Sequence, residues 1–250
     1  MTVLASANFD WSLVWHNRGL FLHGLLVAVE VAGVALVLSV FFGLLVALAR
    51  MGKPPFTWVA TLYVNVFRGV PALVSVLWVY FGISLALNVN FTTFEAGVIA
   101  LTLLYSAFIS EIYRAALEAI PHGQREAGLA LGMSRIRVFG RVVLPQATKI
   151  ALPNIGSMFI GMVKDTSVFT VIGLNEVVRE AQNLNSTYFQ AFTLFTAAGV
   201  LYVAVAFAVD FVFRTVEKTM RTPPTGRLAR LATQRKRRRI EAIAARVTPA

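Results

Sequence analysis

The stretch EAGLALG at residues 126–132, followed by a basic amphipathic run that ends at Pro145, decides how the chain is interpreted. It lies between long apolar segments, yet it carries too many charges and glycines to cross a bilayer itself. Its small residues would let another protein approach the backbone closely, and its charged residues could pair with that protein. We therefore predict a docking element between membrane spans. The residues assigned to this role are Glu126, Ala127, Gly128, Gly132, Arg135 and Pro145.

The composition around this element is that of an integral membrane protein. Of the 250 residues, 57% are hydrophobic and only 14% are charged, whereas about a quarter of the residues of a soluble domain are charged. The mean hydropathy is +0.70. The formal net charge of +11 arises from residues in loops and in the tail, where orientation in the membrane explains it better than nucleic-acid binding does. The absence of cysteine excludes disulfides and thiolate metal sites.

Apolar segments long enough to cross a bilayer lie at about 20–49, 57–87, 94–115, 150–173 and 191–213. The basic turn 50–55 is cytoplasmic by the positive-inside rule, which places the N-terminus outside and the C-terminus in the cytoplasm. The chain is thus predicted to be an all-α integral membrane protein with about five transmembrane helices. We expect an extracytoplasmic segment at 1–19, a membrane domain at 20–213 with a cytoplasmic loop at about 114–149, and a basic cytoplasmic tail at 214–250.

The strongest polar group inside a predicted span is Lys164-Asp165-Thr166-Ser167. Charged side chains are costly in a bilayer unless they are paired or face water. The group therefore indicates a polar cavity or an ion pair between helices. Met158 and Met162 lie on much the same helical face as Asp165, since residues at these spacings align. A purely structural bond from Asp165 to another helix is the alternative.

Two further spans contain a charged residue. Phe67-Arg68-Gly69-Val70-Pro71 interrupts the second span, and a helix kinked at Pro71 with a snorkelling Arg68 would also account for it. Glu30 lies near the start of the first span, where it serves either transport or a polar contact at the interface.

Motifs of catalysis are missing from the sequence. The three histidines share no metal-ligand spacing, and neither G-x-S-x-G nor a phosphate-binding loop occurs. We therefore expect no catalytic residue, no metal site and no ATP-binding site in this chain. The G-x-x-x-G at Gly128 and Gly132 lies in a charged loop, which disfavours a transmembrane dimer seam. The basic run Arg235–Arg239 fits attraction to anionic headgroups better than nucleic-acid binding.

The docking stretch resembles a known family. Glu126-Ala127-Gly128, three residues, Gly132, nine residues and Val142-x-Leu144-Pro145 are similar to the EAA loop of bacterial ABC importer permeases, E-A-A-x3-G-x9-I-x-L-P. Gly128 and Val142 depart mildly from that pattern. The polar amino acid branch, of the histidine and glutamine type, is favoured by Phe67-Arg68-Gly69-Val70-Pro71, Glu111-Ile112-Tyr113-Arg114, Ile120-Pro121-x-Gly123-Gln124, Ala130-Leu131-Gly132-Met133-Ser134, Leu144-Pro145-Gln146-Ala147 and Lys164-Asp165-Thr166-Ser167. Together these matches span about Gly19 to Phe213.

The resemblance implies a permease subunit of an ATP-binding-cassette importer in the bacterial inner membrane. Its coupling helix, near Gln124–Arg137, would dock on a separate ATPase subunit that uses ATP and magnesium, and this chain would bind no cofactor. Its partners would be a second permease subunit, identical or not, membrane lipid and a solute-binding protein that delivers an amino acid. The substrate pathway would include Asp165, Lys164, Thr166, Ser167, Met158, Ser157 and Arg68.

Which amino acid is carried stays open at this stage. Some members that carry cationic amino acids have an acidic residue where this chain has Met158, which disfavours a cationic substrate. A secondary carrier or channel without an ATPase, with Asp165 and Glu30 as ion-coupling groups, is the alternative from another class. The absence of an internal repeat argues against the inverted halves common in such carriers. A membrane-anchored nucleic-acid binder that uses the tail is the third alternative.

Overall fold

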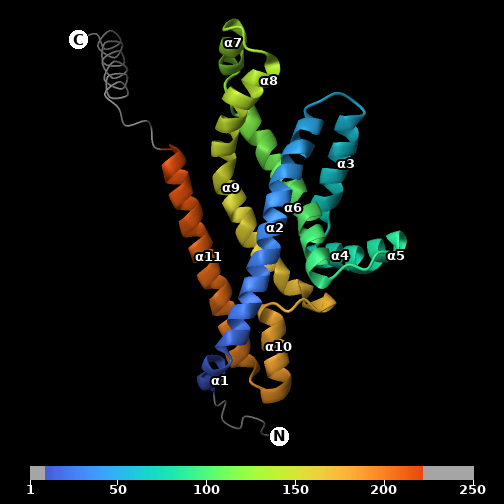
Figure 1. Cartoon of the computed structure of the whole chain (residues 1–250), viewed down its shortest axis with the longest axis vertical. Coiled ribbons are helices and arrows are strands. Elements are labelled where there is room, and N and C mark those ends of the chain that lie inside the picture. The colour runs from blue at the N-terminus through green and yellow to red at the C-terminus, as the bar shows by residue number, and fades with distance from the viewer. Residues whose placement is uncertain (1–8, 222–250) are drawn as a thin grey trace, which may run out of the picture.

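A computed structural model describes residues 9–221, and within them every regular element is helical. This confirms the predicted all-α class. The long helices run roughly along one axis (Figure 1), with α7 (His122–Ala130) and α8 (Arg135–Val138) at one end. The helices α1 (Trp11–His16) and α10 (Val177–Tyr188) lie at the other end. The basic run Arg235–Arg239 lies outside the described residues.

Four helical segments are long and apolar enough to cross a membrane: Arg18–Arg50, Thr93–Glu118, Arg135–Ile172 and Ala191–Met220. They correspond to α2 (Arg18–Arg50), α6 (Thr93–Glu118), the run through α9 (Leu144–Asp165), and α11 (Ala191–Arg221). A fifth span is present if the bent pair Phe56–Gly69 and Ala72–Leu87 counts as one. The number of spans agrees with the prediction of about five.

The centre of the bundle is the contact between α2 and α6. A row of small residues on α2, spaced three or four apart, is fully buried there and includes Ala28, Ala32, Ala35 and Ser39. At Gly43 a Cβ would lie 2.8 Å from the side chain of Ile109, so only glycine permits this approach of the two helices. Small residues at such seams let transmembrane backbones pack closely without a hydrophobic driving force. The helix α6 begins with a capping box between Thr92 and Glu95.

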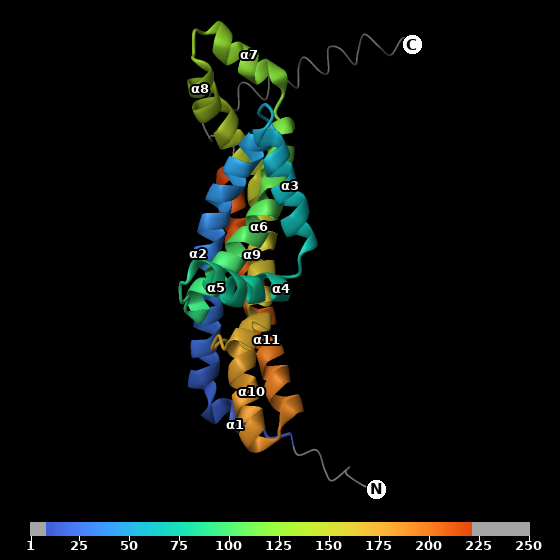
Figure 2. The ribbon, with the colours of Figure 1, turned by 90° about the vertical axis from the view of Figure 1, so that its right-hand side faces the viewer.

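The second span differs from its prediction. The helix α3 (Phe56–Gly69) ends at the glycine, and the chain then turns by 111° into α4 (Ala72–Leu77), a π-helical turn η1 (Trp78–Ile83) and α5 (Ser84–Leu87). Val70 and Pro71 are extended, since the ring of a proline pushes the preceding residue out of the helical region. Figure 2 shows α4 and α5 running crosswise to α2 and α6. The alternative of a single helix kinked at Pro71 is therefore wrong, and 57–87 forms one span only if its two bent parts are counted together.

The fourth span begins earlier than predicted and is not interrupted at Pro145. A π-helical turn η2 (Phe139–Val143) joins α8 directly to α9, and Pro145 lies in the first turn of α9. A proline within a membrane helix is tolerated where a local change of the hydrogen-bond pattern accommodates it, and here the π-helical turn directly precedes Pro145. After Asp165 the chain continues as a 3₁₀ turn η3 (Thr166–Ile172), which ends at Gly173 with a positive φ of 86°.

The segment 174–190, between the fourth and fifth predicted spans, contains the helix α10. Its residues Val177, Ala181 and Leu184 pack with residues of α1, α2 and α11 in a separate apolar cluster. The buried carboxylate of Glu176 caps α10 by accepting from the Arg179 amide, 2.9 Å away, and also accepts from the Tyr202 hydroxyl. Burial raises the pKa of Glu176 in spite of these bonds.

Candidate functional site

A cavity of about 290 Å³ lies where the second span breaks. Its walls come from the start of α4, from the middle of α6 and from the last turns of α9. The lining residues are Val70, Ala72, Leu104, Tyr105, Phe108, Met158, Gly161 and Asp165. Asp165 is the only one with a charged side chain. A single carboxylate in an otherwise apolar hollow is the kind of site that orients a small ligand through a few polar contacts.

The Asp165 carboxylate is fixed by Tyr105. The Tyr105 hydroxyl donates to Oδ2 of Asp165 at 2.9 Å, from α6 to the last residue of α9. The close approach requires Gly161, since a Cβ at that position would lie 2.8 Å from the tyrosine oxygen. The ring of Tyr105 itself joins the main apolar cluster. Sequence reasoning missed Tyr105, because a tyrosine in an apolar span has no local pattern that marks its partner.

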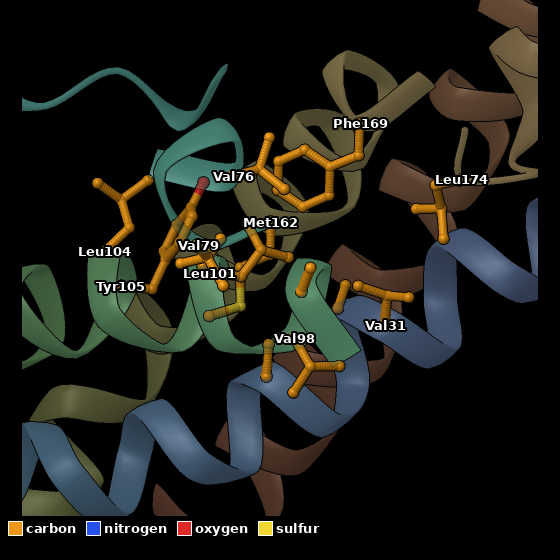
Figure 3. Close-up of a cluster of buried hydrophobic side chains, with 14 of the residues drawn as sticks. Val31, Val76, Val79, Val98, Leu101, Leu104, Tyr105, Met162, Phe169 and Leu174 are labelled. Carbon is orange, nitrogen blue, oxygen red and sulfur yellow. The ribbon is translucent and has the colours of Figure 1, made fainter. Parts of the chain in front are cut away.

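The two methionines before Asp165 have different surroundings. Met158 is half-buried and lines the cavity, whereas Met162 is fully buried among Val76, Leu101 and Phe169 (Figure 3). Around a helix axis, a residue seven positions before Asp165 is offset from it by about 20°, and a residue three positions before it by about 60°. The larger offset turns Met162 from the cavity into the core. The expectation that both methionines share the face of Asp165 was therefore wrong for Met162.

The other predicted pathway residues do not line the cavity. Lys164 is exposed, and it forms no ion pair with Asp165 within residues 9–221. Neighbouring residues of a helix point in different directions, which explains the separation. Three hydroxyls bond their own helix: Thr166 to Val163 O at 2.7 Å, Ser167 to Lys164 O at 2.7 Å, and Ser157 to Pro153 O at 3.4 Å.

Arg68 stands beside the cavity at the end of α3. Its Nη1 lies 3.3 Å from the Glu111 carboxylate, and its guanidinium lies 5.7 Å from the centre of the Phe108 ring, which lines the cavity. Glu111 also accepts from Arg50 at 2.7 Å and from Arg114 at 3.0 Å. The carboxylate thus ties the ends of α2 and α3 to α6. Glu30 is exposed on α2 and does not line the cavity.

The predicted docking stretch forms α7 and the turn after it. Glu126 and Ala127 are exposed on α7, and α7 lies at one end of the molecule (Figure 1). Gly128 is buried instead, and a Cβ there would lie 2.8 Å from Val138 of α8. The small size of Gly128 therefore serves packing inside this chain. Gly132 has a φ of 76°, a left-handed conformation that favours glycine and lets the chain reverse into α8.

The two other predicted docking residues lie further along the same segment. Arg135 is exposed on α8, and Pro145 is the second residue of α9, just after the π-helical turn. The structure thus gathers Glu126, Ala127, Gly132 and Arg135 at one end, whereas Pro145 lies at the entry to the span. Within the described residues, no group of three His, Cys, Asp or Glu side chains could hold a metal ion.

Comparison with known proteins shows to which family the chain belongs. Residues 39–222 match the family model described as the binding-protein-dependent transport system inner membrane component. The chain belongs to this family. The permease is 35% identical over 215 residues to the glutamine transport system permease protein of Escherichia coli (strain K12), which covers 85% of the chain and 98% of that protein. It is 36% identical over 190 residues to the L-cystine transport system permease protein of Bacillus subtilis (strain 168), with 74% and 81% covered.

Solved structures agree with this assignment. The permease matches a chain from the crystal structure of an amino acid ABC transporter with histidines, with a TM-score of 0.76 and 32% identity. The match covers 88% of the permease and all (100%) of that chain. An inward-facing structure of the methionine ABC transporter shares the fold, with a TM-score of 0.70 at 19% identity. The predicted family is confirmed, and the permease is a transport subunit of an ABC importer whose ATPase activity belongs to a separate subunit.

Proposed function

We propose that the permease translocates a neutral amino acid through the cavity beside Asp165. The observation that carries this proposal is the single carboxylate in the lining, held at 2.9 Å by the Tyr105 hydroxyl. A carboxylate in that setting complements the ammonium group of an amino acid. The guanidinium of Arg68, next to the Phe108 ring, is the nearby group of opposite charge that the substrate carboxylate would meet on its way.

The substrate class follows from the count of acidic groups in the cavity. Asp165 is the only acid in the lining, and the substrate ammonium group occupies it. A cationic side chain would then have no second carboxylate to pair with, whereas the thioether of Met158 offers a polarisable contact to an uncharged side chain. Relatives named for glutamine, arginine and L-cystine support an amino acid substrate in general.

The energy for transport comes from a partner ATPase with its ATP and magnesium. Glu126, Ala127 and Gly132 at the α7 end would contact that subunit, Arg135 of α8 would lie at the edge of this contact, and Pro145 would hold the entry of α9. Closure of the ATPase dimer on ATP moves α7 and the attached spans as rigid bodies. ATP drives the switch between the two conformations because it binds them with different affinity. A second permease subunit completes the pathway, and a solute-binding protein delivers the amino acid.

The orientation of the permease follows from its charges. Arg50 is the last residue of α2, Lys53 follows it, and α8 contains Arg135 and Arg137. The end of α2 that leads into α3 lies toward α7 and α8, whereas α1 and α10 lie at the opposite end of the molecule (Figure 1). By the positive-inside rule the α7 end is cytoplasmic and the N-terminus is outside the bacterial inner membrane.

Uptake into proteoliposomes tests this function. The permease is reconstituted with its ATPase, ATP is enclosed in the lumen, and the solute-binding protein with labelled glutamine or cystine is added outside. We expect ATP-dependent accumulation by the wild type and a loss of accumulation in Asp165→Asn with the ATPase still bound. Accumulation without any ATPase would support a secondary carrier instead. Accumulation of arginine in preference to both neutral amino acids would overturn the substrate class.

A further inference from the structure

A second hollow, of about 470 Å³, lies between α7 and α8 on one side and the ends of α2 and α6 on the other. Its floor is apolar and buried, with Leu117, Val138 and Val143 at most 4% exposed. Its rim contains two arginines, Arg125 of α7 and Arg135 of α8. The remaining lining residues are Leu48, Met51, Leu129 and Phe139. The hollow is separate from the cavity at Asp165, with which it shares no residue.

The two arginines at the rim have no acidic partner. Neither Arg125 nor Arg135 takes part in an ion pair within residues 9–221. Arg125 donates only a long bond of 3.4 Å to Leu117 O. The two acids in the C-terminal part of α6 are engaged elsewhere, because Glu118 pairs with Arg114 at 2.9 Å and Glu111 with Arg50 at 2.7 Å. Two guanidinium groups over an apolar floor therefore offer a site for a phosphate that is attached to an apolar body.

The position of the hollow along the spans favours a lipid. Leu48 and Met51 belong to the last turn of α2 and its cap, beside Arg50 and Lys53. A helix of 33 residues is about 50 Å long, whereas the hydrocarbon core is about 30 Å thick. The basic end of α2 therefore lies at the level of the headgroups, and the hollow opens there. The basic tail of this chain carries the same charge as the rim and would be repelled.

We propose that this hollow binds an anionic phospholipid of the inner leaflet. The phosphate lies between Arg125 and Arg135, and the glycerol and upper acyl chains cover Met51, Leu129 and Phe139. The lipid thereby bridges α7 and α8 to the ends of α2 and α6. This inference goes beyond the proposed function, because it needs only that the chain lies in a membrane.

Lipid retention tests the proposal without any measurement of transport. The permease and its ATPase are purified together from nanodiscs with equal amounts of phosphatidylglycerol and phosphatidylcholine, and bound lipids are counted by native mass spectrometry. We expect the wild type to retain phosphatidylglycerol preferentially. Arg125→Gln and Arg135→Gln should each reduce that retention about fivefold, the factor typical of one basic residue near an anionic surface. The matched control is Arg137→Gln, on the exposed face of α8 and outside the lining.

A second pair of variants tests the apolar part of the lining. Met51→Trp narrows the hollow and should reduce retention, whereas Leu45→Trp, exposed on α2 outside the lining, should not. Equal retention of both lipids by the wild type would overturn the proposal. An effect of Arg137→Gln as large as that of Arg125→Gln would also overturn it, since any basic surface would then suffice. Competition by free glycerol phosphate at matched concentration would show that the headgroup alone binds, and would contradict a lipid site.

Discussion

The docking stretch at α7 and the cavity at Asp165 differ in whether the side chains are held by contacts within this chain. Glu126 and Ala127 are exposed, and Leu131 at the end of the same stretch is 83% exposed, so the described part of this chain does not cover them. Asp165 is held by Tyr105, whose ring belongs to the main apolar cluster. Changes in the loop should therefore abolish coupling without loss of stability. Changes in the cavity should affect transport when they remove the charge of Asp165, and should also lower stability when they disturb the packing of Tyr105.

The largest expected effect is that of Ala127→Trp in the loop. The tryptophan would project from the exposed face of α7 and prevent close approach of the ATPase, so ATP-driven uptake should fall about a hundredfold, as for disruption of an interface hot spot. The thermal midpoint of the purified permease should not change. Ala127→Ser, which keeps the residue small, is the control and should retain uptake. Normal uptake by the tryptophan variant would show that α7 is not the docking surface.

Asp165→Asn is expected to have the next largest effect. The side-chain oxygen of asparagine can still accept from Tyr105, so the fold should persist, but the charge that complements the ammonium group is lost. Loss of one charge-assisted bond corresponds to a reduction in uptake of about tenfold to a hundredfold. Uptake and membrane abundance are measured in parallel. Lys164→Gln, on the exposed neighbour, should have a smaller effect. A fall in abundance alone would assign Asp165 a structural role.

The loop was easier to predict than the cavity because its signal is local. EAGLALG, with a glycine at the one left-handed position, specifies a short helix and a reversal whatever lies around it. The break at Pro71 is different, since the same residues permit either a modest kink or the 111° turn that the structure has. The packing of α4 against α6 and η3 selects between them. That packing involves residues far away in the sequence.

The partners of Asp165 also depend on distant residues. Tyr105 lies 60 positions earlier on another helix, and helical periodicity cannot identify which tyrosine meets which carboxylate. Periodicity did place Met158 in the cavity. It misplaced Met162, because an offset of about 60° is enough to move a side chain from a cavity wall into the core. The sequence contains Gly161, but only the structure explains it: a larger residue there would collide with the Tyr105 hydroxyl.

Gly161→Ala should perturb the cavity by a steric route. The added Cβ would lie 2.8 Å from the Tyr105 oxygen, so the tyrosine must shift and release Asp165. We expect a loss of stability of about 1–3 kcal/mol, as for overpacking of a core, and a clear fall in uptake. Thermal unfolding in detergent and uptake are the measurements. Gly199→Ala on α11, where a Cβ meets nothing within 4 Å, is the control. Equal thermal midpoints for the two variants would contradict the close packing at Tyr105.

The smallest effect should come from Tyr105→Phe, which removes one hydroxyl and keeps the ring in the apolar cluster. Asp165 would lose its hydrogen bond from Tyr105 but remain at the cavity wall, where water or substrate can replace the hydroxyl. A single hydrogen bond contributes about 1 kcal/mol, so stability should fall by about that amount and affinity for the amino acid by a few fold. Because the charge remains, uptake at saturating substrate should be close to that of the wild type. If Tyr105→Phe instead abolished uptake as fully as Asp165→Asn, the hydroxyl itself would contact the substrate, and the cavity would have two polar anchors.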